Sequence, residues 1–290
     1  MQSTRSIRSL TTALAFLLIV PGIAFAGAWT QPEGVMYNRV SVNYFRSTAA
    51  FDADGGRTDL GGNGTFFDYN FVWYQEYGLL ERLTFITSIP YKFVQYEDDA
   101  AKSNTWGLGD VDAAARIRLF EKPFVAALQP LVKLPYGYDE DEDVPIGNGQ
   151  VDFEIRLLVG RSLHPLPAYA GAEIGYRVRA GDPSDEIRYL AEAGWTFTQR
   201  LSGRVKLDGT LSVENGGGTD GVNRTLTNEF DLGKLEVTTS YRIRKNLFLE
   251  GTWTPTIYGE NTSQGHTFSL ALAGTLRPKT ICNRLRGENR

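Results

Sequence analysis

The chain has 290 residues, a formal net charge of −4 and one cysteine, Cys282. One cysteine cannot form an intrachain disulfide, which excludes a disulfide-rich secreted scaffold. The mild acidity argues against a nucleic-acid partner, and beyond the N-terminal segment no apolar run approaches the roughly 18 residues of a spanning helix.

The N-terminal segment has the pattern of a Sec-type signal peptide. Arg5 and Arg8 form a short basic start, an apolar run extends over Ala13–Ile23, and Ala24-Phe25-Ala26 supplies small residues for signal peptidase. This pattern predicts cutting before Gly27 and export from the cytoplasm. The remaining length is 290 − 26 = 264 residues.

After residue 27 the chain alternates between apolar and polar residues with a period of two. The runs are about ten residues long, which exceeds the usual strand of a soluble protein and matches a tilted strand that crosses a bilayer. The clearest runs are Phe67–Trp73, Val111–Leu119, Val151–Val159, Ile187–Phe197 and Val205–Val213. Aromatic residues near both strand ends suit the interfacial girdles of a membrane barrel. A soluble β-sandwich is the alternative, but it rarely combines such long strands with so many charges on one face.

The connections alternate in length, which is typical of an outer-membrane barrel with tight turns on the periplasmic side. Short turns are predicted at Gly78–Arg82, Phe120–Pro123, Ser162–Pro167, Thr198–Ser202 and Ile243–Asn246. Longer polar loops are predicted near 47–64, 95–106, 136–150, 180–186, 214–224 and 259–265. The pattern predicts an all-β, transmembrane, antiparallel up-and-down barrel of about twelve strands, with both ends of the wall on the short-turn side.

The polar positions of the alternating runs are expected to face the lumen. Seven charged residues are the candidate lining residues: Arg116, Arg118, Asp152, Glu154, Arg156, Arg204 and Lys206. Because both signs occur, two interpretations stay open: a path for small solutes, or a salt-bridged plug without conductance. A register slip of one residue would reverse every assignment.

The loop near 136–150 carries five consecutive acids, Asp139, Glu140, Asp141, Glu142 and Asp143. The run lacks the spacing of a defined calcium loop, so we expect a solvated loop that attracts cations through a salt-sensitive field. No cofactor and no bound metal are predicted.

The two histidines give little support for an enzyme. His164 lies in a predicted turn, and His266 opens the last strand with Ser263 and Ser269 nearby in sequence. A Ser/His pair could act as nucleophile and base if the side chains met. No Gly-x-Ser-x-Gly elbow accompanies them, and no catalytic residue is predicted.

Five segments, in order, resemble the outer-membrane transporter family named for the meta-cleavage pathway of phenol degradation, over residues 35 to 276. They are Tyr77-Gly78-Leu79-Leu80-Glu81-Arg82-Leu83, Ser88-Ile89-Pro90-Tyr91, Gly107-Leu108-Gly109-Asp110-Val111, Lys133-Leu134-Pro135-Tyr136-Gly137 and Gly147-Asn148-Gly149-Gln150-Val151-Asp152. The resemblance implies an outer-membrane barrel that passes small, aromatic or hydrophobic molecules, and it brings no catalytic residues. Tyr136 departs from the small polar residue common there, which bears on loop detail rather than on the fold.

The predicted organisation is a signal peptide over 1–26, a barrel over 27–276 and a basic tail over 277–290. The predicted function is passive movement of small organic solutes through a monomeric or weakly oligomeric barrel in the bacterial outer membrane. A structural or assembly barrel with a closed lumen is the alternative, and a lipid-active outer-membrane enzyme is the third reading. The expected partners are outer-membrane lipid and lipopolysaccharide, the solute, and the barrel assembly machinery.

Overall fold

All strands in the described part of the chain belong to a single antiparallel sheet. The computed structural model describes residues 27–138, 142–216 and 229–277. Their strands are β1 (Met36–Phe51), β2 (Arg57–Asp59), β3 (Thr65–Leu80), β4 (Leu83–Glu97), β5 (Lys102–Leu108), β6 (Val111–Phe120), β7 (Val125–Leu134), β8 (Asp152–Ser162), β9 (Ala168–Arg179), β10 (Glu186–Thr196), β11 (Leu201–Ser212), β12 (Asp231–Arg244), β13 (Leu247–Glu260) and β14 (Thr262–Leu276).

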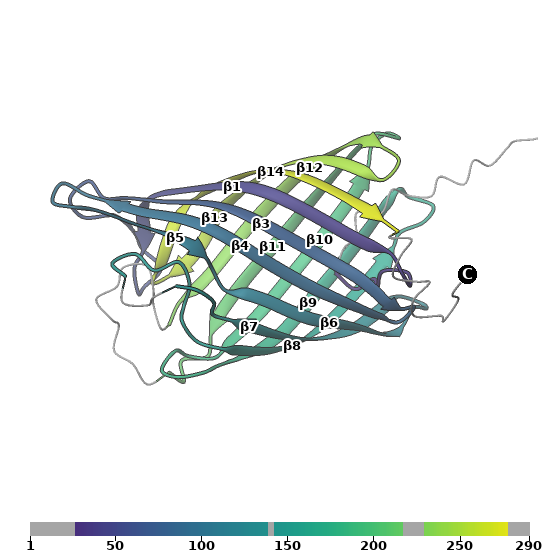
Figure 1. Cartoon of the computed structure of the whole chain (residues 1–290), viewed down its shortest axis with the longest axis horizontal. Coiled ribbons are helices and arrows are strands. Elements are labelled where there is room, and N and C mark those ends of the chain that lie inside the picture. Colours follow the sequence, from purple (N-terminus) through teal and green to yellow (C-terminus); the bar gives the residue numbers. More distant parts are fainter. Residues whose placement is uncertain (1–26, 139–141, 217–228, 278–290) are drawn as a thin grey trace, which may run out of the picture.

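The sheet closes because β14 pairs with β1 along their whole length, from Met36 opposite Leu276 to Phe51 opposite Thr262. Each wall strand pairs with its neighbours in chain order, whereas β2 and β5 only extend the hairpins of β1 and β4 beyond the wall (Figure 1). Twelve strands therefore form a closed up-and-down barrel, as the alternation predicted. Closure leaves no unpaired edge in the wall, which is what a sheet needs in lipid.

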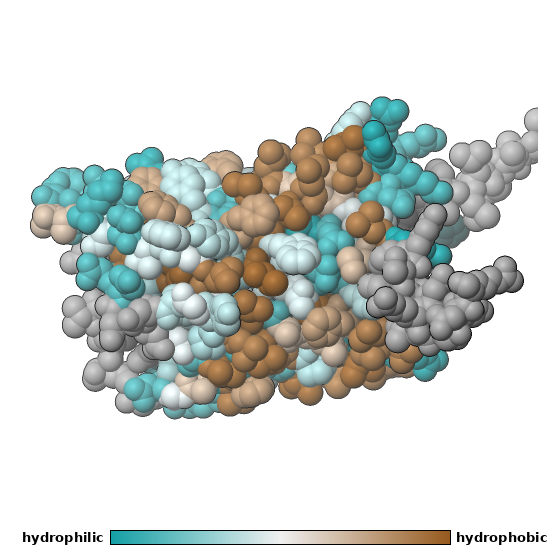
Figure 2. Space-filling view, viewed as in Figure 1, coloured by the Kyte–Doolittle hydropathy of each residue, from teal (hydrophilic) through white to brown (hydrophobic). Residues whose placement is uncertain are grey.

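The apolar side chains of the wall face outward. Phe153, Ile174 and Leu270 are 60%, 57% and 60% exposed, while alternate positions on the same strands are largely buried. On the face that Figure 2 shows, apolar residues cover the middle of the wall, and hydrophilic residues gather toward both rims. These outward-facing apolar side chains form the lipid-facing surface of a transmembrane barrel, its apolar belt.

Five tight turns join the strands at one rim, the short-turn rim, where the sequence predicted them. The opposite end is called the long-loop rim. The predicted loop over 259–265 is wrong: β13 continues to Glu260 and β14 starts at Thr262. Only Asn261 connects them, with a φ of 50° that asparagine tolerates better than most residues. The polar residues there stay in strands because β1 extends equally far and pairs with them.

Several sequence predictions fall on residues outside the described ranges. They are the signal peptide over 1–26, three acids of the loop (Asp139, Glu140, Asp141), Cys282 and the tail from 278. In the part of the chain that is described, no helix is long and apolar enough to cross a membrane.

Candidate functional site: the barrel lumen

The residues before β1 enter the barrel instead of belonging to its wall. We call Gly27–Val35 the N-terminal strap. Ala28 packs with Val125 and Ala127 of β7 and Leu158 of β8, and the Trp29 ring packs against this cluster. The Trp29 ring also meets Tyr169 of β9 edge-on, with centroids 6.1 Å apart. The predicted barrel over 27–276 includes this segment, but its place inside the barrel was not predicted.

Polar contacts hold the other half of the strap to β3 and β4. Gln31 is fully buried. Its backbone N–H donates to Thr84 Oγ1 at 2.7 Å, and its side-chain Nε2 donates to Glu76 Oε2 at 2.6 Å. The strap therefore runs from β9 to β3 along the inner face of the wall, and it also contacts the strands between them.

Arg116 of β6 ties the strap to the wall. Its Nη1 donates to the Trp29 carbonyl at 2.9 Å and lies 3.1 Å from Glu76 Oε1, while its Nε donates to Gln129 Oε1 at 3.0 Å. The Arg116 and Glu76 side chains are 6% and 3% exposed. A buried guanidinium needs a charged partner and filled donors, and this arrangement supplies both.

Two wall glycines make room for the strap. A Cβ at Gly160 would lie 2.5 Å from the Trp29 ring, and one at Gly78 would collide with the Pro32 carbonyl. Glycine in a strand interior often marks such a close approach of another chain segment. Those glycines are the signal by which the strap could have been suspected from the sequence.

The middle of the lumen contains a chain of alternating charges from β8 and β9. Arg156 lies 2.8 Å from Glu173 and also pairs with Glu154, which Arg177 approaches at 2.8 Å. These bonds join charged donors to charged acceptors, the strong class of hydrogen bond. The chain cross-links neighbouring strands along the inner face.

The strands from β11 round to β1 carry smaller clusters of the same kind. Glu236 of β12 lies 2.8 Å from both Arg204 and Lys206 of β11. Arg39 of β1 pairs with Glu250 of β13 at 2.9 Å, two strands away across β14. Each of these acids is paired with a nearby base, so this part of the lumen does not carry a surface charge of one sign.

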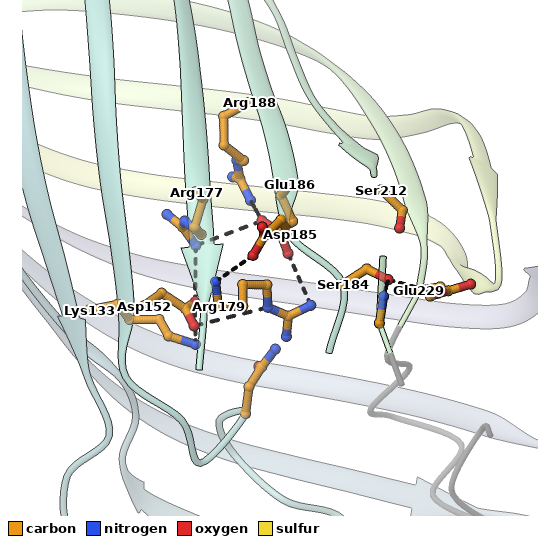
Figure 3. Close-up of polar contacts among 12 residues, drawn as sticks. Lys133, Asp152, Arg177, Arg179, Ser184, Asp185, Glu186, Arg188, Ser212 and Glu229 are labelled. Carbon is orange, nitrogen blue, oxygen red and sulfur yellow. Dashed lines mark hydrogen bonds and ion pairs between the residues drawn. The ribbon is translucent and has the colours of Figure 1, made fainter. Parts of the chain in front are cut away.

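Near the long-loop rim, Lys133, Asp152, Arg179 and Glu186 form a further cluster (Figure 3). Lys133 lies 2.8 Å from Asp152, and Arg179 lies 3.3 Å from Glu186. Asp185, in the connection beside it, accepts bonds from the Arg179 backbone N–H at 3.0 Å and from Asn215 Nδ2 at 3.0 Å. These two hydrogen bonds, first the one from the Arg179 backbone and then the one from Asn215, keep the pKa of the Asp185 carboxyl below its usual range.

The connection between β7 and β8 folds into the lumen from this rim. Val144 and Ile146 are each 2% exposed and pack on Val94 of β4, with Phe66 of β3 against the cluster. Their burial inside the bore identifies this connection as an inward loop, and it narrows the long-loop end.

Three of the segments that carry the family resemblance meet at the base of the inward loop, around Asp110. Asp110 accepts a bond from the Tyr138 hydroxyl, lies 3.3 Å from Lys133 Nζ, and accepts from the Asn148 backbone N–H at 3.3 Å. A Cβ at Gly147 would strike both Asp110 and Tyr138. These contacts of Asp110, Lys133 and Asn148 hold the inward loop against the wall.

A cavity of about 350 Å³ lies beneath the inward loop. Its wall combines apolar side chains with one ion pair, Lys92 Nζ to Asp68 Oδ2 at 3.2 Å. The lining residues are Phe66, Asp68, Asn70, Val72, Pro90, Lys92, Val94, Asp110, Pro145, Ile146, Gly147 and Asn148. The volume is within the range of small-molecule sites, and the wall is mixed, because Asp68, Asn70, Lys92, Asp110 and Asn148 share it with apolar residues.

The seven predicted lining residues all take part in ion pairs. Six lie in the clusters described above, whereas Arg118 pairs with Glu121 at 3.0 Å in the turn after β6. The acidic partners Glu76, Glu173, Glu236 and Glu250 were not among the predicted site residues.

In the acidic loop, Asp143 accepts a bond from Ser103 at 2.9 Å, and Glu142 is exposed.

The structure does not assemble a Ser/His pair. His266 lies on the exposed outer face, with its ring stacked on Trp253 at 6.0 Å. Ser263 and Ser269 are each three positions from His266, and an odd spacing along a strand places side chains on opposite faces. His164 is exposed in the turn after β8. No group of three or more histidine, cysteine, aspartate or glutamate side chains that could hold a metal ion occurs in the described ranges.

No protein-family model matches the chain, and no curated protein matches its sequence. Among solved structures, the COG4313 outer membrane channel from Pseudomonas putida F1 is similar with a TM-score of 0.68 and 14% identity, covering 88% of this chain and 100% of that one. The NanC porin is similar with a TM-score of 0.53 and 9% identity, covering 82% and 100%. At these identities the likeness concerns the fold. The chain has the fold of a bacterial outer-membrane β-barrel.

Proposed function

We propose that the protein is a passive outer-membrane channel for small organic solutes, with aromatic or otherwise hydrophobic compounds as the preferred class. The observation that carries the proposal is the cavity under the inward loop, whose wall combines apolar side chains with polar ones, among them the Lys92–Asp68 pair. A small organic molecule with both an apolar part and polar groups matches such a wall better than a bare ion does.

The charge arrangement of the lumen supports an organic solute over an ion. A strongly ion-selective pore presents charged rings of one sign, whereas here the acids and bases neutralise each other at close range. Paired charges leave a polar, hydrated surface with a weak net field. Movement through it is diffusion down the concentration gradient.

A second function is favoured by one specific observation. The strap fills part of the short-turn end of the bore and is buried there by Arg116 and Glu76. That observation favours a structural or assembly barrel whose lumen is closed.

Single-channel recording of the purified, refolded barrel in a planar bilayer separates the two functions. We expect reproducible conductance steps with weak ion selectivity at low and high salt. The charge reversal Arg156→Glu is expected to shift that selectivity, whereas Arg161→Glu, an exposed residue toward the short-turn rim, leaves it unchanged. A folded barrel that passes neither current nor solute into vesicles contradicts the channel and supports the structural barrel.

A further inference from the structure

We propose that the outer face of the wall carries a binding site for a phosphate group of lipopolysaccharide, formed by Arg46 of β1 and His266 of β14. The two residues lie directly opposite each other where β14 closes on β1. Both are exposed on the lipid side of the barrel. The site is therefore separate from the lumen and independent of solute passage.

The pairing of β1 with β14 places both side chains within reach of one anion. Directly opposite residues of an antiparallel pair share a face, and their Cβ atoms lie about 4.5–5.5 Å apart. The Arg46 guanidinium offers a fork of N–H groups that matches two phosphate oxygens, and the His266 imidazole offers at least one N–H. A phosphate between the two side chains can accept hydrogen bonds from both.

Aromatic rings hold both side chains in place. The guanidinium carbon of Arg46 lies over the Phe67 ring of β3, 5.7 Å from its centroid, which is within the range of a cation–π contact. The His266 ring stacks on Trp253 of β13, with an angle of 18° between the ring planes. Stacking covers the face of the imidazole, and its N–H groups, which lie in the ring plane, stay free to donate.

The charge of Arg46 is not neutralised within the protein. Among the residues that the structure describes, no carboxylate pairs with it, whereas Arg39 of the same strand pairs with Glu250 in the lumen at 2.9 Å. Arg57, on the long-loop side of the barrel, pairs with Asp59 at 3.2 Å. A cation at a membrane surface is attracted by anionic lipid headgroups, so a lipid phosphate supplies the charge that Arg46 lacks.

The rows of outward side chains below the pair set its depth in the membrane. One step of two residues, about 7 Å along a strand, leads toward the short-turn rim to an aromatic row. This row consists of Tyr69, Tyr44, Phe268 and Trp253, which the register aligns across β3, β1, β14 and β13. The following row contains Val42 and Leu270, each 60% exposed. Aromatic rows mark the headgroup level of a barrel, so the pair lies among headgroups and the apolar row lies among acyl chains.

The position of the pair also identifies the leaflet. Arg46 and His266 lie on the long-loop side of the aromatic row, and long loops of an outer-membrane barrel face the cell exterior. The lipid of that leaflet is lipopolysaccharide, whose lipid A carries phosphates above its acyl chains. Lipid A therefore matches both the basic pair and the exposed apolar row beneath it.

Native mass spectrometry of the refolded barrel in detergent, titrated with lipid A, tests the site. We expect Arg46→Gln to bind lipid A about tenfold more weakly than the wild type, because it loses a hydrogen bond between charged groups. His266→Leu loses the imidazole donor, and about threefold weaker binding is expected. The control Arg57→Gln removes the same charge from the long-loop side and is expected to bind like the wild type. Equal affinities in all four proteins overturn the site.

Three further probes identify the source of the phosphate. Dephosphorylated lipid A is expected to bind more weakly to the wild type, and equally to the wild type and Arg46→Gln. Inorganic phosphate is expected not to displace lipid A, because it makes no contact with the apolar row. Displacement by inorganic phosphate, or tighter binding of phosphatidylglycerol with the same dependence on Arg46, overturns the assignment to lipopolysaccharide.

Thermal unfolding provides a second measurement and shows whether the variants are folded. A ligand that binds only the folded barrel raises its unfolding midpoint. Without lipid A, we expect equal midpoints for the wild type, Arg46→Gln and Arg57→Gln. Lipid A is expected to raise the midpoint of the wild type and Arg57→Gln more than that of Arg46→Gln. An equal rise in Arg46→Gln contradicts the site.

Discussion

At the scale of single residues, the pair of Arg116 and Glu76 is the buried charge contact on which the strap depends. Its two side chains are almost fully buried, and Glu76 also accepts bonds from Gln31 and from the Tyr74 hydroxyl at 2.6 Å each. Removing one member of a buried pair leaves the other uncompensated, which costs about 3–5 kcal/mol. We expect Glu76→Gln to lower the free energy of unfolding by about that amount, measured by urea unfolding in lipid vesicles.

The matched comparison for Glu76 is Glu121, whose side chain is 56% exposed and pairs with Arg118. Exposed pairs contribute about 0–1 kcal/mol, so Glu121→Gln is expected to leave the unfolding midpoint nearly unchanged. Equal losses in both variants contradict the structural role of the buried pair.

At the scale of elements, alternation predicted the strands, their facing and the five short turns because a period of two follows from the pleat alone. It could not predict which charges meet. Arg39 and Glu250 are 211 positions apart, and only closure of β14 on β1 brings them together. The strap was not predicted because a nine-residue segment inside the lumen needs no alternation of apolar and polar residues. The predicted loop over 259–265 was wrong because polar strand residues of a membrane barrel can continue beyond the lipid.

The cavity under the inward loop can be tested by filling it. Val72 lines the cavity from β3, whereas Val42 on the adjacent β1 is 60% exposed on the outer face. We expect Val72→Trp to reduce the uptake of small aromatic solutes into vesicles strongly, because the indole occupies space that the solute needs. Val42→Trp adds the same group to the lipid face, and its uptake is expected to match the wild type. Unchanged uptake in Val72→Trp removes the cavity from the solute path.

At the scale of the whole molecule, the barrel is stable only in a solvent that covers its apolar belt. Its outer face exposes large apolar side chains along every wall strand, while its charges are paired inside. This is the reverse of a soluble protein, whose core is apolar and whose surface is charged. The fold therefore specifies the membrane as its environment before any solute is considered.

That reversal predicts how a charge on the outer face behaves with depth. Ile174 lies in the middle of β9 and is 57% exposed, and Ile187 lies at the long-loop end of β10 and is 36% exposed. Arginine near the bilayer midplane of a barrel costs about 2–4 kcal/mol, and near the interface about 0–1 kcal/mol. We expect Ile174→Arg to lower the free energy of unfolding in vesicles by the larger amount and Ile187→Arg by the smaller. Equal costs would contradict a difference in membrane depth between the two positions.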